Sequence, residues 1–122
     1  MCAATFAQYG GVEALTGDQA CVAAMVAEFD RRRVLICERL KAMPGIQLVV
    51  PDGAFYVLPY VGDLGMDSAT FAAYLLENAQ IAVVPGGAFG EFTGGTIRIS
   101  YANSYDNLEK AMDRMEKAVR AL

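Results

Sequence analysis

The sequence predicts an α/β protein of the two-layer α+β kind, with a small mixed or antiparallel sheet of about four strands covered by helices. Segments with apolar residues at helical spacing are interspersed with short β-branched runs, and clusters of Pro, Gly and Asp separate them. The chain has 122 residues, of which 55% are hydrophobic and 20% are charged. That length and composition suit one globular domain.

The amino-terminal part is predicted to be helical. Residues 5–15 are rich in alanine, and Gly10 and Gly11 predict a break or bend in this first short helix. Thr16 and Gln19 have the spacing of a capping box for a second helix.

The second helix is predicted from apolar residues that recur every three or four positions. It should stop near Met43, because Pro44 and Gly45 do not continue a helix. Cys37 falls within this apolar pattern and is interpreted as a small buried residue. The apolar positions are Val22, Met25, Val26, Phe29, Ile36 and Leu40.

Four short runs are predicted to be strands. Residues 46–50 and 54–58 flank the turn residues 51–53 and predict a hairpin. Residues 81–84 and 96–101 are the third and fourth runs, each next to a glycine pair.

Two further helices follow from capping residues and apolar spacing. Asp67 or Ser68 is placed to cap one helix, and Ser104 to cap the last. The last helix is predicted to bury one face and to expose its charged side chains. The predicted buried face consists of Leu108, Ala111, Met112, Met115, Val119 and Leu122.

Charge and hydropathy argue against several classes of partner. The net charge is −4, and the only basic cluster is Arg31–Arg33, so nucleic-acid binding has little electrostatic support. No apolar run has the length of a membrane-spanning helix. Residues 1–10 contain no basic residue before an apolar stretch and do not resemble a signal peptide.

The residue types present also limit the possible chemistry. The chain has no histidine, which excludes catalytic triads built on that residue and the commonest metal ligand. Its cysteines are Cys2, Cys21 and Cys37, without C-x-x-C spacing, which argues against a disulfide framework or a zinc site. Reduced thiols favour a cytoplasmic location. We expect no metal site.

The fourth predicted strand carries the strongest candidate for ligand binding. It alternates between one set of apolar residues and a second set of polar ones, Thr96, Arg98 and Ser100. A guanidinium is planar and permanently charged, so Arg98 is a candidate receptor for both oxygens of a carboxylate. The alternative is an arginine on a half-solvated strand.

Two other features are weaker candidates. The turn at residues 85–90 could present backbone amides to a phosphate, although it lacks the full glycine-loop motifs. Lys41, Lys110 and Lys117 fall on predicted polar surfaces, so none has the protected setting that a Schiff-base lysine needs. The residues alone therefore indicate a globular domain with a possible carboxylate-binding arginine.

Four segments, in this order, resemble motifs of class I pyridoxal-phosphate-dependent aminotransferases of the aspartate aminotransferase superfamily, which have fold type I. Order and spacing agree over nearly all of the chain. The segments are A-Q-Y-G-G-V-E-A-L-T-G at residues 7–17, P-D-G-A-F-Y-V at 51–57, V-V-P-G-G-A-F-G at 83–90 and I-R-I-S-Y-A at 97–102.

The resemblance implies the small, carboxy-terminal domain of such an enzyme. Residues 17–122 would form that domain, and residues 1–16 would link it to a large domain. Arg98 would bind the substrate α-carboxylate, with Phe55 and Tyr56 near the pocket wall. The substrates would be an amino acid and a 2-oxoacid, and the parent would be a homodimer.

The family's S-x-x-K lysine and its other cofactor-binding residues have no counterpart in this sequence. Pyridoxal 5′-phosphate would be bound by the missing large domain, with no catalytic or cofactor-binding residue here. We therefore expect a fragment that is inactive alone.

The alternatives are a C–S lyase or another fold type I enzyme, and a non-catalytic small-molecule-binding or assembly domain. An S-x-x-K motif about sixty residues upstream of Thr5 would favour the enzyme.

Overall fold

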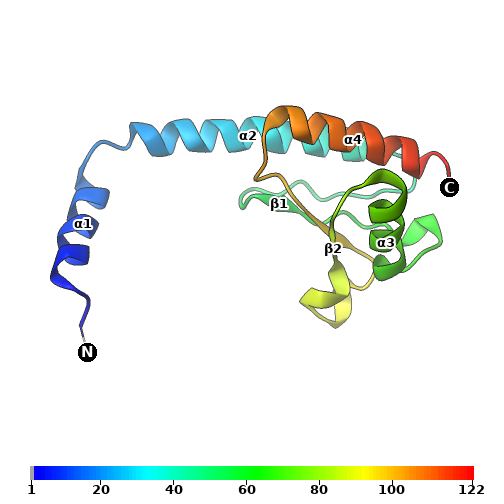
Figure 1. Cartoon of the computed structure of the whole chain (residues 1–122), viewed down its shortest axis with the longest axis horizontal. Helices are drawn as coiled ribbons and strands as arrows, with labels where there is room; N and C mark the ends of the chain where they lie inside the picture. Colours follow the sequence, from blue (N-terminus) through cyan, green and yellow to red (C-terminus); the bar gives the residue numbers. More distant parts are fainter. Residues whose placement is uncertain (1) are drawn as a thin grey trace.

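The computed structural model describes residues 2–122, which form four α-helices and a three-stranded sheet. Figure 1 shows helices α2 and α4 side by side above the sheet, with α3 beside it. This arrangement confirms the predicted fold class. The elements are α1 (Thr5–Thr16), α2 (Ala20–Lys41), β1 (Tyr56–Val57), α3 (Ser68–Ala79), β2 (Val84–Pro85), β3 (Ile97–Ser100) and α4 (Tyr105–Val119).

The sheet is antiparallel and has the order β1-β3-β2. Beyond β1, the chain continues along β3 in the same register, since Ile97 N–H donates to the Pro59 carbonyl and Val61 N–H to the Gly95 carbonyl. Pro59 has no N–H to return, which interrupts the regular ladder at that point. The strand predicted over residues 54–58 is therefore shorter, at Tyr56–Val57.

The predicted strand at residues 46–50 is wrong. This segment pairs only at Gln47, which exchanges backbone hydrogen bonds with Tyr60 in an isolated bridge. The predicted hairpin is thus reduced to one bridge. Val49 is 90% exposed, so the β-branched run does not mark a buried strand here.

The third strand is displaced from its predicted position. Strand β2 lies at Val84–Pro85 rather than at residues 81–84, because the Ile81 N–H is used elsewhere. It donates to the Leu75 carbonyl and closes the end of α3, where Gln80 adopts a left-handed conformation. The Ile81 amide therefore ends α3 and is not available for pairing in the sheet.

The hydrophobic core lies between the sheet and the helices. Val57, Ile97 and Ile99 are buried on one face of the sheet, together with apolar side chains from the carboxy-terminal half of α2 and from α3 and α4. Helix α4 packs against both α2 and α3.

Cys37 is buried as predicted, and burial raises the pKa of its thiol.

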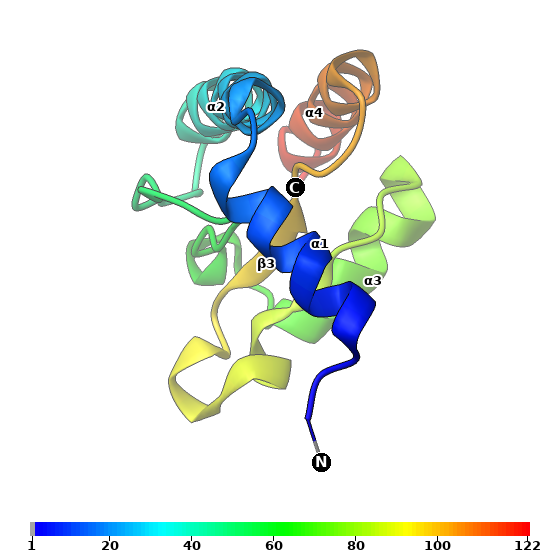
Figure 2. The same ribbon diagram turned by 90° about the vertical axis from the view of Figure 1, so that its left-hand side faces the viewer.

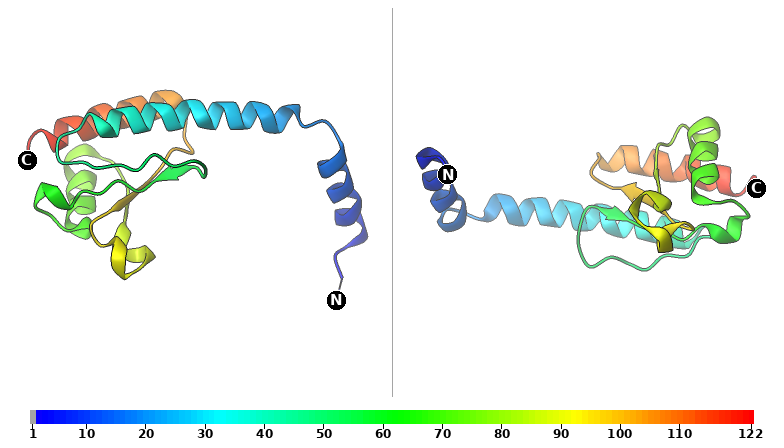
Figure 3. Two further views of the ribbon diagram at one scale, coloured as in Figure 1. Left: turned by 180° about the vertical axis from the view of Figure 1, so that it is seen from behind. Right: turned by 90° about the horizontal axis from the view of Figure 1, so that it is seen from below.

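Helix α1 and the first half of α2 extend away from this core. Figures 1 and 3 show α2 continuing well beyond α4, with α1 turned sharply at its far end. Figure 2 looks along α2, with α1 running across it in front. None of the residues of α1 is buried. The helix runs through Gly10 and Gly11, so the predicted break is wrong.

The capping predictions had mixed outcomes. The side chains of Asp67 and Ser104 accept hydrogen bonds from the backbone at the starts of α3 and α4, as predicted. The capping box of Thr16 and Gln19 is wrong, because the Thr16 hydroxyl donates to the Val12 carbonyl instead. Asp18 accepts from Ala20 N–H at the start of α2.

Helix α4 follows its predicted pattern with one exception. Leu108, Met112, Met115 and Val119 are buried, and Ala111 is half-buried. The prediction for Leu122 is wrong, since that residue lies beyond the helix and is 51% exposed.

No helix within residues 2–122 combines the length and the apolar character needed to cross a membrane.

Stability should decrease in acid. Hydrogen bonds from Arg31 and Arg32 lower the pKa of Glu28 to about 2, and hydrogen bonds from Arg120 and Arg39 lower that of Glu116. A carboxylate with a lowered folded-state pKa stabilises the fold above its unfolded pKa, and this contribution is lost as the pH falls towards the folded value. We expect the thermal midpoint to fall between pH 4.5 and pH 2.

This can be measured by circular dichroism over that pH range at low and high salt. The Glu28→Gln variant should lose part of the pH dependence, and salt should weaken it because the pair is exposed. An identical pH profile for the variant and the wild type would contradict this role of Glu28.

Candidate functional site

Arg98 lies on the face of the sheet opposite the helices. In β3 it alternates with Ile97 and Ile99, which are buried in the core, while Arg98 itself is half-buried. The predicted alternation is therefore confirmed. Its antiparallel neighbour on β2 is Val84, and Tyr56 on β1 lies opposite Ser100. Residues directly opposite one another project to the same face, so Tyr56, Arg98 and Ser100 share the open face.

Two aromatic rings hold the Arg98 guanidinium. Its central carbon lies 5.6 Å from the centroid of Tyr56 and 4.9 Å from that of Phe89. Both distances are in the range of cation–π attraction. The rings come from β1 and from the turn after β2, so they converge on Arg98 from different parts of the chain.

Arg98 differs from most other arginines in its lack of an acidic partner. Within residues 2–122, its guanidinium forms no ion pair and donates no hydrogen bond to protein. The arginines that do pair with Asp or Glu are Arg31, Arg32, Arg33, Arg39 and Arg120. A half-buried guanidinium with unused donors is suited to binding an external carboxylate.

Of the three predicted site residues, two are in contact, and the third is in contact with one of these two. Tyr56 contacts Arg98, and the Phe55 ring meets the Tyr56 ring edge-on at 5.6 Å between centroids. Phe55, however, is 52% exposed and lines a different pocket. Its link to Arg98 runs through the Tyr56 ring, which both residues contact.

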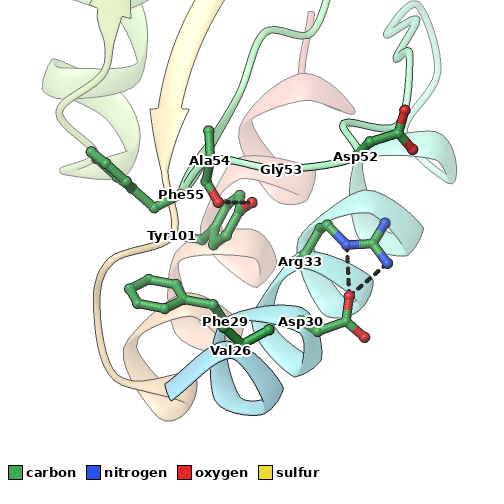
Figure 4. Close-up of a pocket in the computed structure, with 9 residues that line it drawn as sticks. All are labelled: Val26, Phe29, Asp30, Arg33, Asp52, Gly53, Ala54, Phe55 and Tyr101. Carbon is green, nitrogen blue, oxygen red and sulfur yellow. Dashed lines mark hydrogen bonds and ion pairs between the residues drawn. The ribbon is translucent and has the colours of Figure 1, made fainter. Parts of the chain in front are cut away.

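That other pocket has a volume of about 350 Å³ and lies between α2 and residues 52–55. Figure 4 shows Arg33 at its wall, bonded to Asp30, and the Tyr101 hydroxyl donating to the Ala54 carbonyl at 2.9 Å. Burial raises the pKa of Tyr101. The positive charge here is already matched by Asp30, so this pocket is less suited to an anion than Arg98 is.

Phe89 is a further candidate site residue that the sequence did not indicate. It was visible only as one member of the glycine-containing turn at residues 85–90. In the structure, Gly86 permits a close approach of the turn to Thr96, where a Cβ atom would overlap Thr96 and the Thr93 carbonyl. The Gly86 N–H donates to the Thr96 carbonyl at 2.7 Å, so it is not free for a phosphate. The turn instead positions Phe89.

The described residues include no lysine in a setting suited to a Schiff base with pyridoxal 5′-phosphate. Lys41, Lys110 and Lys117 are all exposed, whereas a Schiff-base lysine needs a pocket that excludes water. Among residues 2–122, no three Cys, Asp or Glu side chains are grouped as metal ligands.

Comparisons with known proteins agree with this structure. The family model for aminotransferase class I and II matches residues 1–115. An aspartate aminotransferase from Pyrococcus abyssi is 47% identical over 121 residues, covering 98% of this chain and 31% of that protein. Aromatic-amino-acid aminotransferase 2 from Thermococcus litoralis is 44% identical, with coverage of 98% and 31%.

Solved structures give the same result. The aromatic aminotransferase from Pyrococcus horikoshii matches with a TM-score of 0.90 and 45% identity, over 98% of this chain and 32% of that one. The alanine aminotransferase from Pyrococcus furiosus matches with a TM-score of 0.92 and 33% identity, over 99% and 31%. This chain spans about a third of the length of these relatives. It belongs to the aminotransferase class I and II family.

Proposed function

We propose that this chain is the carboxylate-binding small domain of a pyridoxal-phosphate-dependent aminotransferase. The parent enzyme transfers an amino group between an amino acid and a 2-oxoacid, and it is a homodimer. Residues 17–122 form the small domain, and residues 1–16 lead to a large domain that carries the cofactor. The observation that carries the proposal is the half-buried Arg98 guanidinium, which has no acidic partner within residues 2–122 and lies near two aromatic rings.

Arg98 binds the α-carboxylate of the substrate through two parallel N–H donors. Tyr56 and Phe89 limit the rotation of the guanidinium before substrate arrives, which lowers the entropic cost of binding. They also cover part of its surface from water, which strengthens a charged hydrogen bond. Fixing the carboxylate fixes the orientation of the adjacent carbon, where the amino group is exchanged.

The chain alone does not supply the rest of the site. Its lysines are exposed, and we assign pyridoxal 5′-phosphate to the part of the parent enzyme that this chain does not span. We therefore expect no transamination when the 122-residue chain is mixed with the cofactor, aspartate and 2-oxoglutarate. Sustained turnover, or a borohydride-reducible imine at one lysine, would contradict this expectation.

A chimeric enzyme tests the positive part of the proposal. This chain would replace the matching 121-residue segment of the Pyrococcus abyssi aspartate aminotransferase, with which it is 47% identical. We expect the purified chimera to bind pyridoxal phosphate and to transaminate an amino acid. A chimera that folds and binds the cofactor but has no transaminase activity on a panel of amino acids would count against the assigned role.

A further inference from the structure

A second candidate binding site lies beside α4. It is a groove of about 610 Å³, between the first half of α4, the end of β3 and the segment that follows α3. This volume is in the range of small-molecule sites. Ser100 of β3 is among its lining residues but Arg98 is not, so the groove begins beyond the carboxylate-binding position proposed above.

The groove combines a positive rim with an apolar floor. Its polar lining includes the cations Lys110 and Arg114 and the amides Asn103 and Asn107. Buried apolar side chains form its floor, and they are Ile81, Ile99, Leu108 and Met112. Among the described residues, those lining the groove include no Asp or Glu, although the whole chain has a net charge of −4.

The two cations have little interaction with the protein. Within residues 2–122, the Lys110 ammonium donates no hydrogen bond, and Arg114 donates only from Nε to the Lys110 carbonyl of its own helix, at 3.3 Å. Asp106 lies one turn before Lys110, a spacing that often allows an ion pair, yet no such pair forms. The outer donors of both side chains are free for an external anion.

Two acidic residues of α4 pair with an arginine of α2. Asp113 and Glu116 face α2 and bind Arg39 there, at 2.6 and 3.2 Å. Lys110 and Arg114 lie one turn apart, where like charges repel each other. An anion bound between them would relieve that repulsion.

We propose that this groove binds a small organic carboxylate with an apolar body. The carboxylate pairs with Lys110 and Arg114. The apolar body lies against the accessible apolar lining, which Ala82, Ala102 and Ala111 provide. Both features are needed, because an exposed ion pair alone contributes little and because the apolar floor alone does not select an anion.

Ligand titration of the 122-residue chain tests this proposal, with 3-phenylpropionate as the probe and amide NMR shifts as the readout. We expect saturable shifts centred on residues 80–82 and 103–114. Acetate, which lacks the apolar body, and 3-phenylpropanamide, which lacks the charge, should each bind at least about fivefold more weakly.

Variants identify the residues responsible. The double variant Lys110→Gln/Arg114→Gln should weaken binding of 3-phenylpropionate by about tenfold, because two charged contacts are lost. Lys41→Gln removes one exposed positive charge at the end of α2, outside the groove, and should leave binding unchanged. Circular dichroism checks that each variant retains the fold.

The outcomes separate this site from Arg98. Shifts that disappear in Arg98→Gln but persist in the double variant would place the probe at Arg98 and would refute the groove. Equal binding of 3-phenylpropionate and its neutral amide, or absence of saturation, would also refute it. None of these results depends on transaminase activity, so the groove and the proposed function can fail independently.

Discussion

Replacing Arg98 with lysine in the Pyrococcus abyssi chimera is expected to lower kcat/KM by about a hundredfold, because a bidentate charged contact is lost. Lysine keeps the positive charge but cannot present two parallel N–H donors to a carboxylate. It also loses the guanidinium contact with Tyr56 and Phe89, whose ring centroids lie 5.6 and 4.9 Å from the guanidinium carbon. Steady-state kinetics with the wild-type chimera as reference measure the effect.

A matched control is available in the same chain. Arg120 is exposed and pairs with Glu116 at 2.8 Å, so Arg120→Lys makes the same chemical change far from the open face of the sheet. We expect that variant to retain kcat/KM. If Arg98→Lys also stays within about threefold of the wild type, Arg98 is structural and the assigned role is wrong.

The Phe89 contact gives a further measure of how Arg98 is held. A Phe89→Leu change keeps an apolar side chain but removes the ring 4.9 Å from the guanidinium. If the ring pre-orders Arg98, the variant should show a raised KM for the amino acid. A merely structural effect on the turn would lower the thermal midpoint without a selective change in KM.

The sequence predicted the helices better than the strands. Helices α3 and α4 depend on local signals, namely the caps Asp67 and Ser104 and apolar residues at helical spacing, and these signals operate wherever the segment lies. Strands depend on partners. Residues 46–50 have a strand-like composition, but they pair only through Gln47, which the residues alone do not indicate.

The candidate site was also predictable only where it depends on local signals. The alternation in β3 placed Arg98 opposite the core, and it needed only the period of a strand. The position of Phe89 depends on the close approach of Gly86 to Thr96, a contact between different segments. That Arg98 has no acidic partner in the described part of the chain likewise depends on the whole fold.

The arm formed by α1 and the start of α2 carries apolar side chains that the core does not cover. Phe6, Tyr9 and Leu15 on α1 are 75–84% exposed, and Met25 and Val26 on α2 are more than half exposed. Removing such surface from water is favourable by about 25 cal/mol per Å². Contiguous exposed patches of this kind promote association, and a net charge of −4 opposes it only weakly.

We therefore expect the isolated chain to self-associate as its concentration rises, with α1 loosely held. A helix of 12 residues with two glycines is marginal in water without tertiary contacts. Light scattering should show an average mass above that of the 13.1 kDa monomer, and hydrogen exchange should be fast in residues 5–16. The amides of α3 and α4, which pack on the core, should exchange much more slowly.

Substitutions distinguish this arm from apolar residues exposed elsewhere. The combined change Phe6→Ser and Leu15→Ser removes two of its most exposed apolar side chains and should shift the sample towards monomer. Phe92→Ser is the control, because Phe92 is 99% exposed but lies in the turn after β2, away from the arm. Equal effects of both changes would mean that association is not specific to the arm. A strictly monomeric wild-type chain with strongly protected amides in α1 would mean that the arm is stable without any partner, and the proposal that it leads to a large domain would lose its physical support.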